Sequence, residues 1–265
     1  MNTENNNNVI PQYPPLLSEP AWVPVAKKVR CFFNNELIAN SERVMLKRQF
    51  PMTYFFPRED VRTDLLNPGD QEQHKDKWGT TVSHHISVDG KTANNSALIY
   101  KEQNDAAPEN INNYVTFKWE AMDRWMEEDD EVIIHPSDPY NRIDVCHSSR
   151  HVRIEIEGKT VAETTCPMLL FETGLPVRFY IRKSDIDMKL LKPTDHQTGC
   201  PYKGLASYYS VVTNGNETKN IAWTYPFPDE EALKIKGLIA FYSENIDTVF
   251  IDGKKLPNEK TKWSF

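Results

Sequence analysis

The chain has 265 residues, of which 39% are hydrophobic, 11% aromatic and 26% charged. This is the composition of an ordinary globular protein, long enough for one large domain or two small ones, and we expect two. The formal net charge of −7 opposes binding to phosphate backbones and anionic lipid heads, so neither nucleic acid nor a membrane surface is expected as a partner.

Residues 1–20, which begin MNTENNNNVIPQYPP, form a segment rich in Asn and Pro. Such a segment buries too little apolar surface to fold alone, and we interpret it as a flexible leader. It lacks the basic and apolar regions of a signal peptide, and no later stretch approaches about eighteen apolar residues. We therefore expect a cytoplasmic protein, with the nucleus as an open alternative.

The chain contains an internal repeat. A shift of 125 residues maps residues 51–100 onto residues 176–225, and VRCFFNNELIANS at Val29 lies on VRIEIEGKTVAET at Val152 with a shift of 123. Two copies of one domain explain both registers. The predicted organisation is a degenerate first copy at 21–134, a connecting segment at 135–151 and a second copy at 152–265.

The predicted elements of each copy are mostly strands. In the first copy, the segment YVTFKWEAMDRWMEEDDEV has apolar residues at helical spacing, which predicts one inserted amphipathic helix. In the second copy, VRIEIEGKTVAE and ASYYSVVTNGNETKNIAWTY alternate apolar and polar residues around Glu-Gly and Asn-Gly, and both are predicted hairpins. GLIAFY and TVFIDG add short closing strands.

The segment HPSDPYNRIDVCHSSRHVRI joins the copies and is rich in turn-forming residues. It could serve as a plain linker, or it could fold back into a groove between the copies. The sequence leaves both interpretations open.

Metal and cofactor chemistry have little support in the sequence. The four cysteines, Cys31, Cys146, Cys166 and Cys200, include no Cys-x-x-Cys pair, so we expect neither structural zinc nor disulfides. Adjacent His84 and His85 would face opposite sides of a strand and could not easily share one metal. We expect no metal and no cofactor.

The sequence resembles a known family. The residues that carry the resemblance are LLFETGLPVRFYI, DIDMKLLKPTDHQTGCPYKGLASYYSV, IAWTYPFP and GLIAFYSENIDTVFIDG, and the first half resembles the degenerate copy of tandem members. They are similar to the domain of unknown function 427 family, which carries a nucleotidyltransferase-like label. The resemblance implies an Mss4-like, or β-tent, fold, and it implies no established activity.

The differences between the copies indicate the candidate site. Leucines, a proline, an aspartate and glycines recur in both copies, whereas the shift of 125 replaces Cys200 by Lys75 and Lys203 by Trp78. We expect Glu172 and Lys203 to be catalytic, through a carboxyl group for acid/base chemistry and a cation at a tight turn. The expected ligand-binding residues are Arg178, Tyr180, Cys200, Tyr202 and Trp223. Inert core aromatics, an exposed Glu172 or Lys203 and a buried Cys200 thiol are the structural alternatives.

The functional hypothesis is binding of a small sugar-like or carboxylate-bearing metabolite in the second copy, with metal-independent acid/base catalysis as its extension. Cys200 is expected to form a wall of the site rather than a covalent nucleophile, because no base is assured beside it. One alternative is a non-catalytic module that binds a protein partner. A second is nucleotidyltransferase-like activity, for which Asp185 and Asp187 lack the expected Gly-Ser partner.

Overall fold

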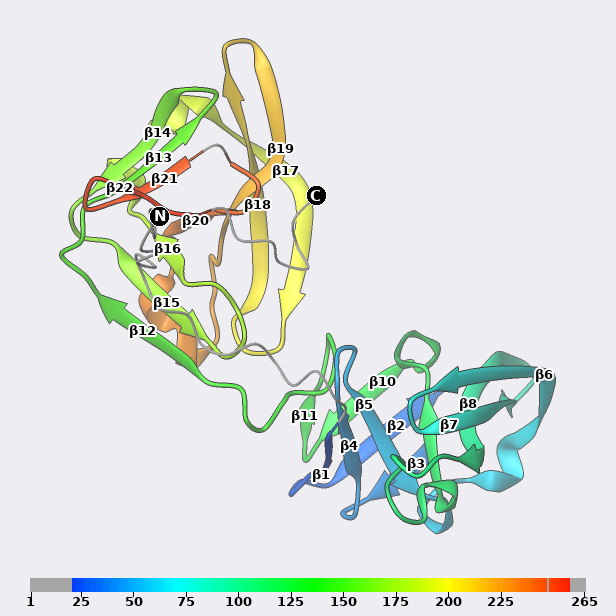
Figure 1. The fold of residues 1–265 in the computed structure, drawn as a ribbon. Coiled ribbons are helices and arrows are strands. Elements are labelled where there is room, and N and C mark those ends of the chain that lie inside the picture. Colours follow the sequence, from blue (N-terminus) through cyan, green and yellow to red (C-terminus); the bar gives the residue numbers. More distant parts are fainter. Residues whose placement is uncertain (1–20, 247, 258–265) are drawn as a thin grey trace. The chain divides into compact units, whose positions relative to one another are not determined.

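The computed structural model describes residues 21–246 and 248–257. Contacts within this part of the chain define two compact units, and the boundary in the sequence lies between Pro139 and Tyr140. Each unit consists mainly of β-strands with short 3₁₀ helices (Figure 1). The prediction of a mostly β chain built from tandem domains is therefore confirmed.

The first unit contains two sheets. One has the order β1-β4-β5-β9-β8-β7-β6, and the other has the order β11-β10-β2-β3. The strands are β1 (Ala21–Pro24), β2 (Val29–Phe33), β3 (Glu36–Ser41), β4 (Met45–Arg48), β5 (Thr53–Pro57), β6 (Leu66–Asp76), β7 (Gly79–Val88), β8 (Lys91–Gln103), β9 (Tyr114–Phe117), β10 (Arg124–Glu127) and β11 (Asp130–Glu131). The 3₁₀ helices are η1 (Arg58–Asp60), η2 (Thr63–Leu65), η3 (Ile111–Asn113) and η4 (Trp119–Ala121).

The second unit contains three hydrogen-bonded groups of strands, β12-β15-β16, β17-β18-β19-β20 and β14-β13-β21-β22. The strands are β12 (Ile143–His147), β13 (Val152–Ile156), β14 (Lys159–Thr164), β15 (Met168–Glu172), β16 (Arg178–Tyr180), β17 (Leu191–Cys200), β18 (Gly204–Thr213), β19 (Asn216–Thr224), β20 (Ile239–Phe241), β21 (Thr248–Ile251) and β22 (Lys254–Lys255). The 3₁₀ helices are η5 (Lys183–Asp185), η6 (Met188–Leu190) and η7 (Glu230–Ile235).

The two units have the same strand order. A bridge between Ile181 and Ile239 joins β16 to β20, so β12-β15-β16-β20-β19-β18-β17 repeats the order of the seven-stranded sheet. The sheet β22-β21-β13-β14 likewise repeats β11-β10-β2-β3. The internal repeat in the sequence is thus a repeat of topology.

The inserted helix predicted in the first copy does not form. Its residues make β9, the short η4 and β10, and these elements occupy the places that β20 and β21 occupy in the second unit. Phe117 and Trp125 are buried from two different strands, on either side of a turn. Their spacing in the sequence matched that of a helix by coincidence. The segment that contains Trp125 forms a strand because it pairs with β2.

Each unit has a large core between its sheets and a smaller aromatic cluster under the long hairpins. The smaller cluster includes Phe55, Trp78 and Tyr100 in the first unit. In the second unit it includes Tyr180 and Trp223. These smaller clusters support the hairpin turns at which the two copies differ.

The predicted connecting segment, residues 135–151, contributes to both units. In the first unit, Asp138 is 3% exposed and accepts a hydrogen bond from Nε of Arg48 at 2.7 Å. In the second unit, β12 pairs with β15 along its full length.

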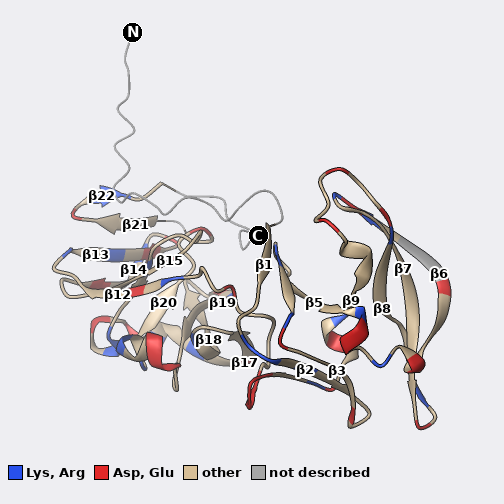
Figure 2. Ribbon diagram, turned by 90° about the horizontal axis from the view of Figure 1, so that it is seen from below, with Lys and Arg blue, Asp and Glu red and all other residues tan. Residues whose placement is uncertain are grey.

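Acidic and basic residues are spread over both units (Figure 2).

Candidate functional site

The candidate site lies in the second unit, where residues of several strands gather near the turn of a hairpin. Glu172 ends β15, Tyr180 ends β16 and Cys200 ends β17. Lys203 lies in the turn between β17 and β18, and Trp223 lies on β19. Residues far apart in the sequence are thus brought together by sheet pairing.

The turn that presents Lys203 is fixed by its neighbours. Cys200 pairs with Gly204, and the Lys203 backbone amide donates to the Cys200 carbonyl at 3.3 Å. Gly204 has a φ of +86°, and a Cβ there would lie 3.2 Å from the Phe227 carbonyl oxygen. Glycine therefore allows the turn to close against the following loop.

Lys203 and Glu172 form an ion pair inside the unit. Nζ of Lys203 donates to Oε2 of Glu172, and the two residues are only 8% and 6% exposed. Burial lowers the pKa of Lys203, but the Glu172 carboxylate and the Cys200 sulfur outweigh it, so this pKa lies above its usual value. Lys203 is therefore an ammonium at neutral pH, and the pair has no net charge.

The Cys200 thiol lies in the electrostatic field of Lys203 and Glu172. The positive charge of Lys203 and the Tyr202 backbone amide both favour its anion. Burial raises the pKa of Cys200, Lys203 lowers it and Glu172 raises it again, and the net result is a raised pKa. The thiol is thus protonated at neutral pH, next to groups that could stabilise its anion.

Phenol groups line the same corner. Nε1 of Trp223 donates to the Tyr180 hydroxyl at 3.1 Å. Burial raises the pKa of Tyr180, and it also raises the pKa of Tyr225, which interacts with Cys200 and Glu172. These phenols stay protonated and can act as hydrogen-bond donors.

Arg178 lies beside Trp223 and has a carboxylate partner of its own. Its terminal nitrogens contact Glu244 at 2.5 and 2.7 Å. The guanidinium lies 5.4 Å from the Trp223 ring centroid and 5.6 Å from that of Tyr242. Arg178 thus holds the aromatic wall in place, and its charge is neutralised.

The structure therefore groups most of the predicted site residues. Glu172, Lys203, Cys200 and Tyr180 meet at one corner, and Trp223 connects this corner to Arg178. Tyr202 is partly exposed and contributes its backbone amide.

Sequence reasoning missed the aromatic and acidic residues that complete the site. The Tyr208 hydroxyl lies 2.8 Å from Oγ1 of Thr198 and 3.1 Å from the Tyr242 hydroxyl, and the Tyr242 ring lies 4.5 Å from Trp223. Alternation along ASYYSVV gave a signal for Tyr208, which lies on the inward face of β18. Glu244 lies in a loop, where no periodic pattern identifies an inward residue.

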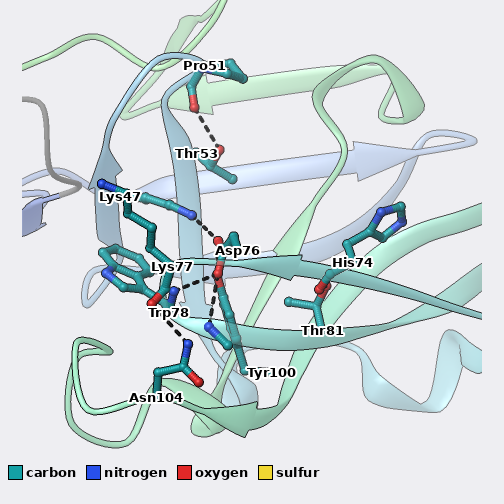
Figure 3. Close-up of polar contacts among 11 residues, drawn as sticks. Lys47, Pro51, Thr53, His74, Asp76, Lys77, Trp78, Thr81, Tyr100 and Asn104 are labelled. Carbon is teal, nitrogen blue, oxygen red and sulfur yellow. Dashed lines mark hydrogen bonds and ion pairs between the residues drawn. The ribbon is translucent and has the colours of Figure 1, made fainter.

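The first unit has a different arrangement at the equivalent corner (Figure 3). Nζ of Lys47 contacts the Asp76 carboxylate and lies 4.6 Å from the Trp78 ring centroid. The Tyr100 hydroxyl donates to Oδ2 of Asp76 at 2.7 Å. Trp22 packs edge-on against Trp78, with centroids 5.5 Å apart. Aromatic side chains thus fill the space under this hairpin.

The strand registers correct the predicted alignment at the hairpin end. Cys200 pairs with Gly204, as Asp76 pairs with Gly79, so the counterpart of Cys200 is Asp76 and not Lys75. The constant shift failed because the irregular stretches of β6 and β17 differ in length by one residue. Lys203 then corresponds to an extra position in the longer turn of the second unit.

The two units hold ion pairs of opposite polarity between the same elements. In the first unit the ammonium is on β4 and the carboxylate ends β6. In the second unit the carboxylate is on β15 and the ammonium follows β17. An ion pair between this strand and this hairpin is therefore common to both units, whereas the buried lysine beside a thiol belongs to the second.

The acids of the nucleotidyltransferase hypothesis take part in local hydrogen bonds. Asp185 accepts from Oγ1 of Thr164 at 2.7 Å, and Asp187 accepts from the Lys189 backbone amide at 3.3 Å. Within residues 21–246 and 248–257, no three His, Cys, Asp or Glu side chains are grouped as metal ligands. No helix in this part of the chain is both long and apolar enough to cross a membrane.

The fold and the site define a tandem protein of two equivalent β units, one of which holds a buried lysine, carboxylate and thiol. The model of the family described as Domain of unknown function (DUF427) matches residues 21–128 and again residues 144–252. The chain belongs to this family, as the sequence predicted. No curated protein matches the chain.

Proposed function

We propose that the second unit binds a small, neutral, polar ligand of sugar-like chemistry at the corner formed by Glu172, Lys203 and Tyr180. The observation that carries the proposal is the buried Lys203–Glu172 pair. The corresponding pair of the first unit is more exposed, and its lysine lies on a strand and not in the hairpin turn. A buried ion pair contributes little net stability, because the cost of desolvating its two charges offsets their attraction. Buried ionisable groups are, however, concentrated at functional sites.

The charges of the site favour a neutral ligand over a carboxylate. Lys203 is neutralised by Glu172 and Arg178 by Glu244, so an anion would have to displace a buried carboxylate. The hydroxyls of a sugar can instead accept from the ammonium and the phenols and donate to Glu172. Trp223 and Tyr242 supply the flat apolar surface that a sugar ring packs against.

Acid/base catalysis is the extension of this proposal. Glu172 would accept a proton from a ligand hydroxyl, and the Lys203 ammonium would stabilise the oxyanion that results. Arg178, Cys200, Trp223 and the Tyr202 turn would shape the site. We further propose that each unit has the Mss4-like, or β-tent, arrangement, and that the protein acts in the cytoplasm, where its free cysteines would remain reduced.

Thermal-shift measurements with panels of neutral sugars and of small carboxylates test the proposal. The double variant Lys203→Met/Glu172→Gln removes both charges without leaving either one buried alone. The matched control is Lys47→Met/Asp76→Asn, which neutralises the equivalent pair of the first unit. Stabilisation by a sugar should disappear in the first variant and persist in the control. Binding that is undiminished in the first variant rules out this site, and a response only to carboxylates rules out the neutral ligand.

A non-catalytic interaction module is the second candidate. It is favoured by large apolar side chains exposed on the second unit, Phe227 at 83%, Leu233 at 54% and Leu205 at 50%. Changing all three to serine should abolish binding of a protein partner and leave sugar binding unchanged. Loss of sugar binding in this variant would instead assign these residues to the ligand site.

A further inference from the structure

We propose that the second unit has an outer subsite formed by Tyr208, Thr198 and His196, and that a second sugar ring of the ligand binds there. The inference rests on the proposed function and deepens it, because that function concerns only the inner corner at Glu172 and Lys203. It names the class of ligand as one with at least two linked sugar rings.

A continuous row of rings leads from the inner corner to the outer subsite. The Tyr242 ring centroid lies 4.5 Å from that of Trp223 and 6.4 Å from that of Tyr208. The His196 ring continues the row, with its centroid 4.6 Å from that of Tyr208. These separations are typical of packed rings. A ligand that packs on Trp223 and Tyr242 at the inner corner can therefore extend along the row.

The row becomes accessible to solvent at its outer end. Trp223 and Tyr208 are only 6% and 5% exposed, whereas His196 and Thr198 are exposed side chains of β17. β17 is the last strand of its hydrogen-bonded group, so the row ends at an edge of the sheet. A sugar ring at this edge can contact the row while the rest of the ligand stays in water.

Hydroxyl groups determine the polar chemistry of the outer subsite. The Tyr208 hydroxyl lies 2.8 Å from Oγ1 of Thr198 and 3.1 Å from the Tyr242 hydroxyl, and either oxygen of each pair could donate. If Tyr208 donates to Thr198, the Thr198 hydroxyl can donate outward, and if Thr198 donates to Tyr208, its oxygen can accept from outside. A neutral imidazole at His196 likewise has one donor and one acceptor nitrogen. A sugar hydroxyl, which both donates and accepts, suits these groups better than an ion does.

The first unit has different residues at the equivalent positions. Ser83 and Tyr208 are both the fifth residue of their strands, β7 and β18. Ser83 pairs with Leu98, as Tyr208 pairs with Trp223. Ser83 donates to Oδ1 of Asn95 at 3.1 Å, a contact within its own hairpin. The repeated fold therefore does not require aromatic residues at these two positions, and their presence in the second unit favours a role in binding.

Isothermal titration calorimetry with one-ring and two-ring ligands tests the inference. The probes are the methyl glycosides of the common neutral hexoses, the disaccharides that contain the same sugars, and the corresponding phenyl glycosides. A disaccharide should bind the wild type about tenfold more tightly than the matching methyl glycoside, which corresponds to one or two net hydrogen bonds. The ratio of these two affinities is the quantity to compare among variants.

Single substitutions of exposed residues assign the gain to the outer subsite. His196→Ala and Thr198→Val should each lower the ratio by about two- to tenfold, because each removes one hydrogen-bonding group. The matched control is His147→Ala, which removes another exposed histidine of the second unit and should keep the wild-type ratio.

The outcomes separate this inference from the proposed function. Equal affinity for the methyl glycoside and the disaccharide overturns the outer subsite and leaves the proposed function standing. A loss in His147→Ala as large as that in His196→Ala also overturns the subsite. A gain in affinity with the phenyl glycosides but none with the disaccharides overturns the second sugar ring. If none of the glycosides binds, the proposed function and this inference both fail.

Discussion

Arg178 holds Glu244 through both terminal guanidinium nitrogens, and the Glu244 side chain is 1% exposed. The pair fixes the guanidinium beside the rings of Trp223 and Tyr242. The expectation that Arg178 contacts a ligand stays a prediction. In the structure its terminal nitrogens face a buried carboxylate, so Arg178 positions the aromatic wall.

The Arg178–Glu244 pair gives a prediction about stability. Arg178→Met should lower the free energy of unfolding by about 3–5 kcal/mol, because Glu244 is left buried without its cation. Adding Glu244→Gln should restore much of the loss. Urea denaturation followed by tryptophan fluorescence measures both variants. A double variant no more stable than the single one would show that the loss comes from packing and not from the unpaired charge.

The ion pairs Lys203–Glu172 and Lys47–Asp76 should differ in how much they contribute to the free energy of unfolding. Lys203→Met leaves the buried Glu172 alone and should cost about 3–5 kcal/mol. Lys47→Met leaves Asp76, whose side chain is 37% exposed, and should cost at most about 1 kcal/mol. Amide hydrogen exchange resolves the two units separately. Equal losses would contradict the difference in burial on which the candidate site depends.

Cys200→Ser should leave sugar binding largely intact, because we propose that the protonated thiol forms only a wall of the site. We expect a stability loss of about 1 kcal/mol, in the usual range for one altered buried side chain. Thermal shift with and without ligand provides both values in one experiment. Complete loss of binding in a folded Cys200→Ser variant would make the sulfur a ligand contact.

His84 should make the first unit sensitive to mild acid. Burial, together with the positive charge of Arg58, lowers the pKa of His84 below its usual value of about 6.5. Because its pKa is lower in the folded state, His84 contributes stability at pH values above its unfolded-state pKa. This contribution is lost as the pH falls toward the folded-state pKa. His84→Gln should reduce the loss of stability between neutral and mildly acidic buffer, as followed by urea midpoints. A wild type and variant with parallel pH profiles would contradict the prediction.

Local sequence patterns predicted the elements whose pairing is also local. The Glu-Gly and Asn-Gly signals correspond to the hairpins β13–β14 and β18–β19, with Gly158 and Gly215 at positive φ. The failure at Trp125 has a physical cause, because its strand pairs with β2, more than ninety positions earlier in the chain. A window of eleven to eighteen residues cannot detect a partner at that separation.

The comparison between copies located the site better than any single motif did. It singled out Lys203 because the constant shift aligns it with Trp78, and the structure puts Lys203 next to Glu172. It misplaced Cys200 by one residue, since an alignment without strand registers cannot locate a bulge. The comparison did not identify Glu244, because its partner, Arg178, is sixty-six positions away in the sequence and in a different element.

The opposite polarity of the two ion pairs also bears on how a tandem chain avoids misassembly. Two copies with one strand order could exchange hairpins during folding, and such exchange is a known failure of repeated domains. A first-unit hairpin on the second-unit sheet would bring Asp76 toward Glu172, and the reverse exchange would bring Lys203 toward Lys47. Both exchanges place like charges together, whereas both native pairings place opposite charges together. The charge reversal would therefore disfavour an exchange of hairpins between the two units.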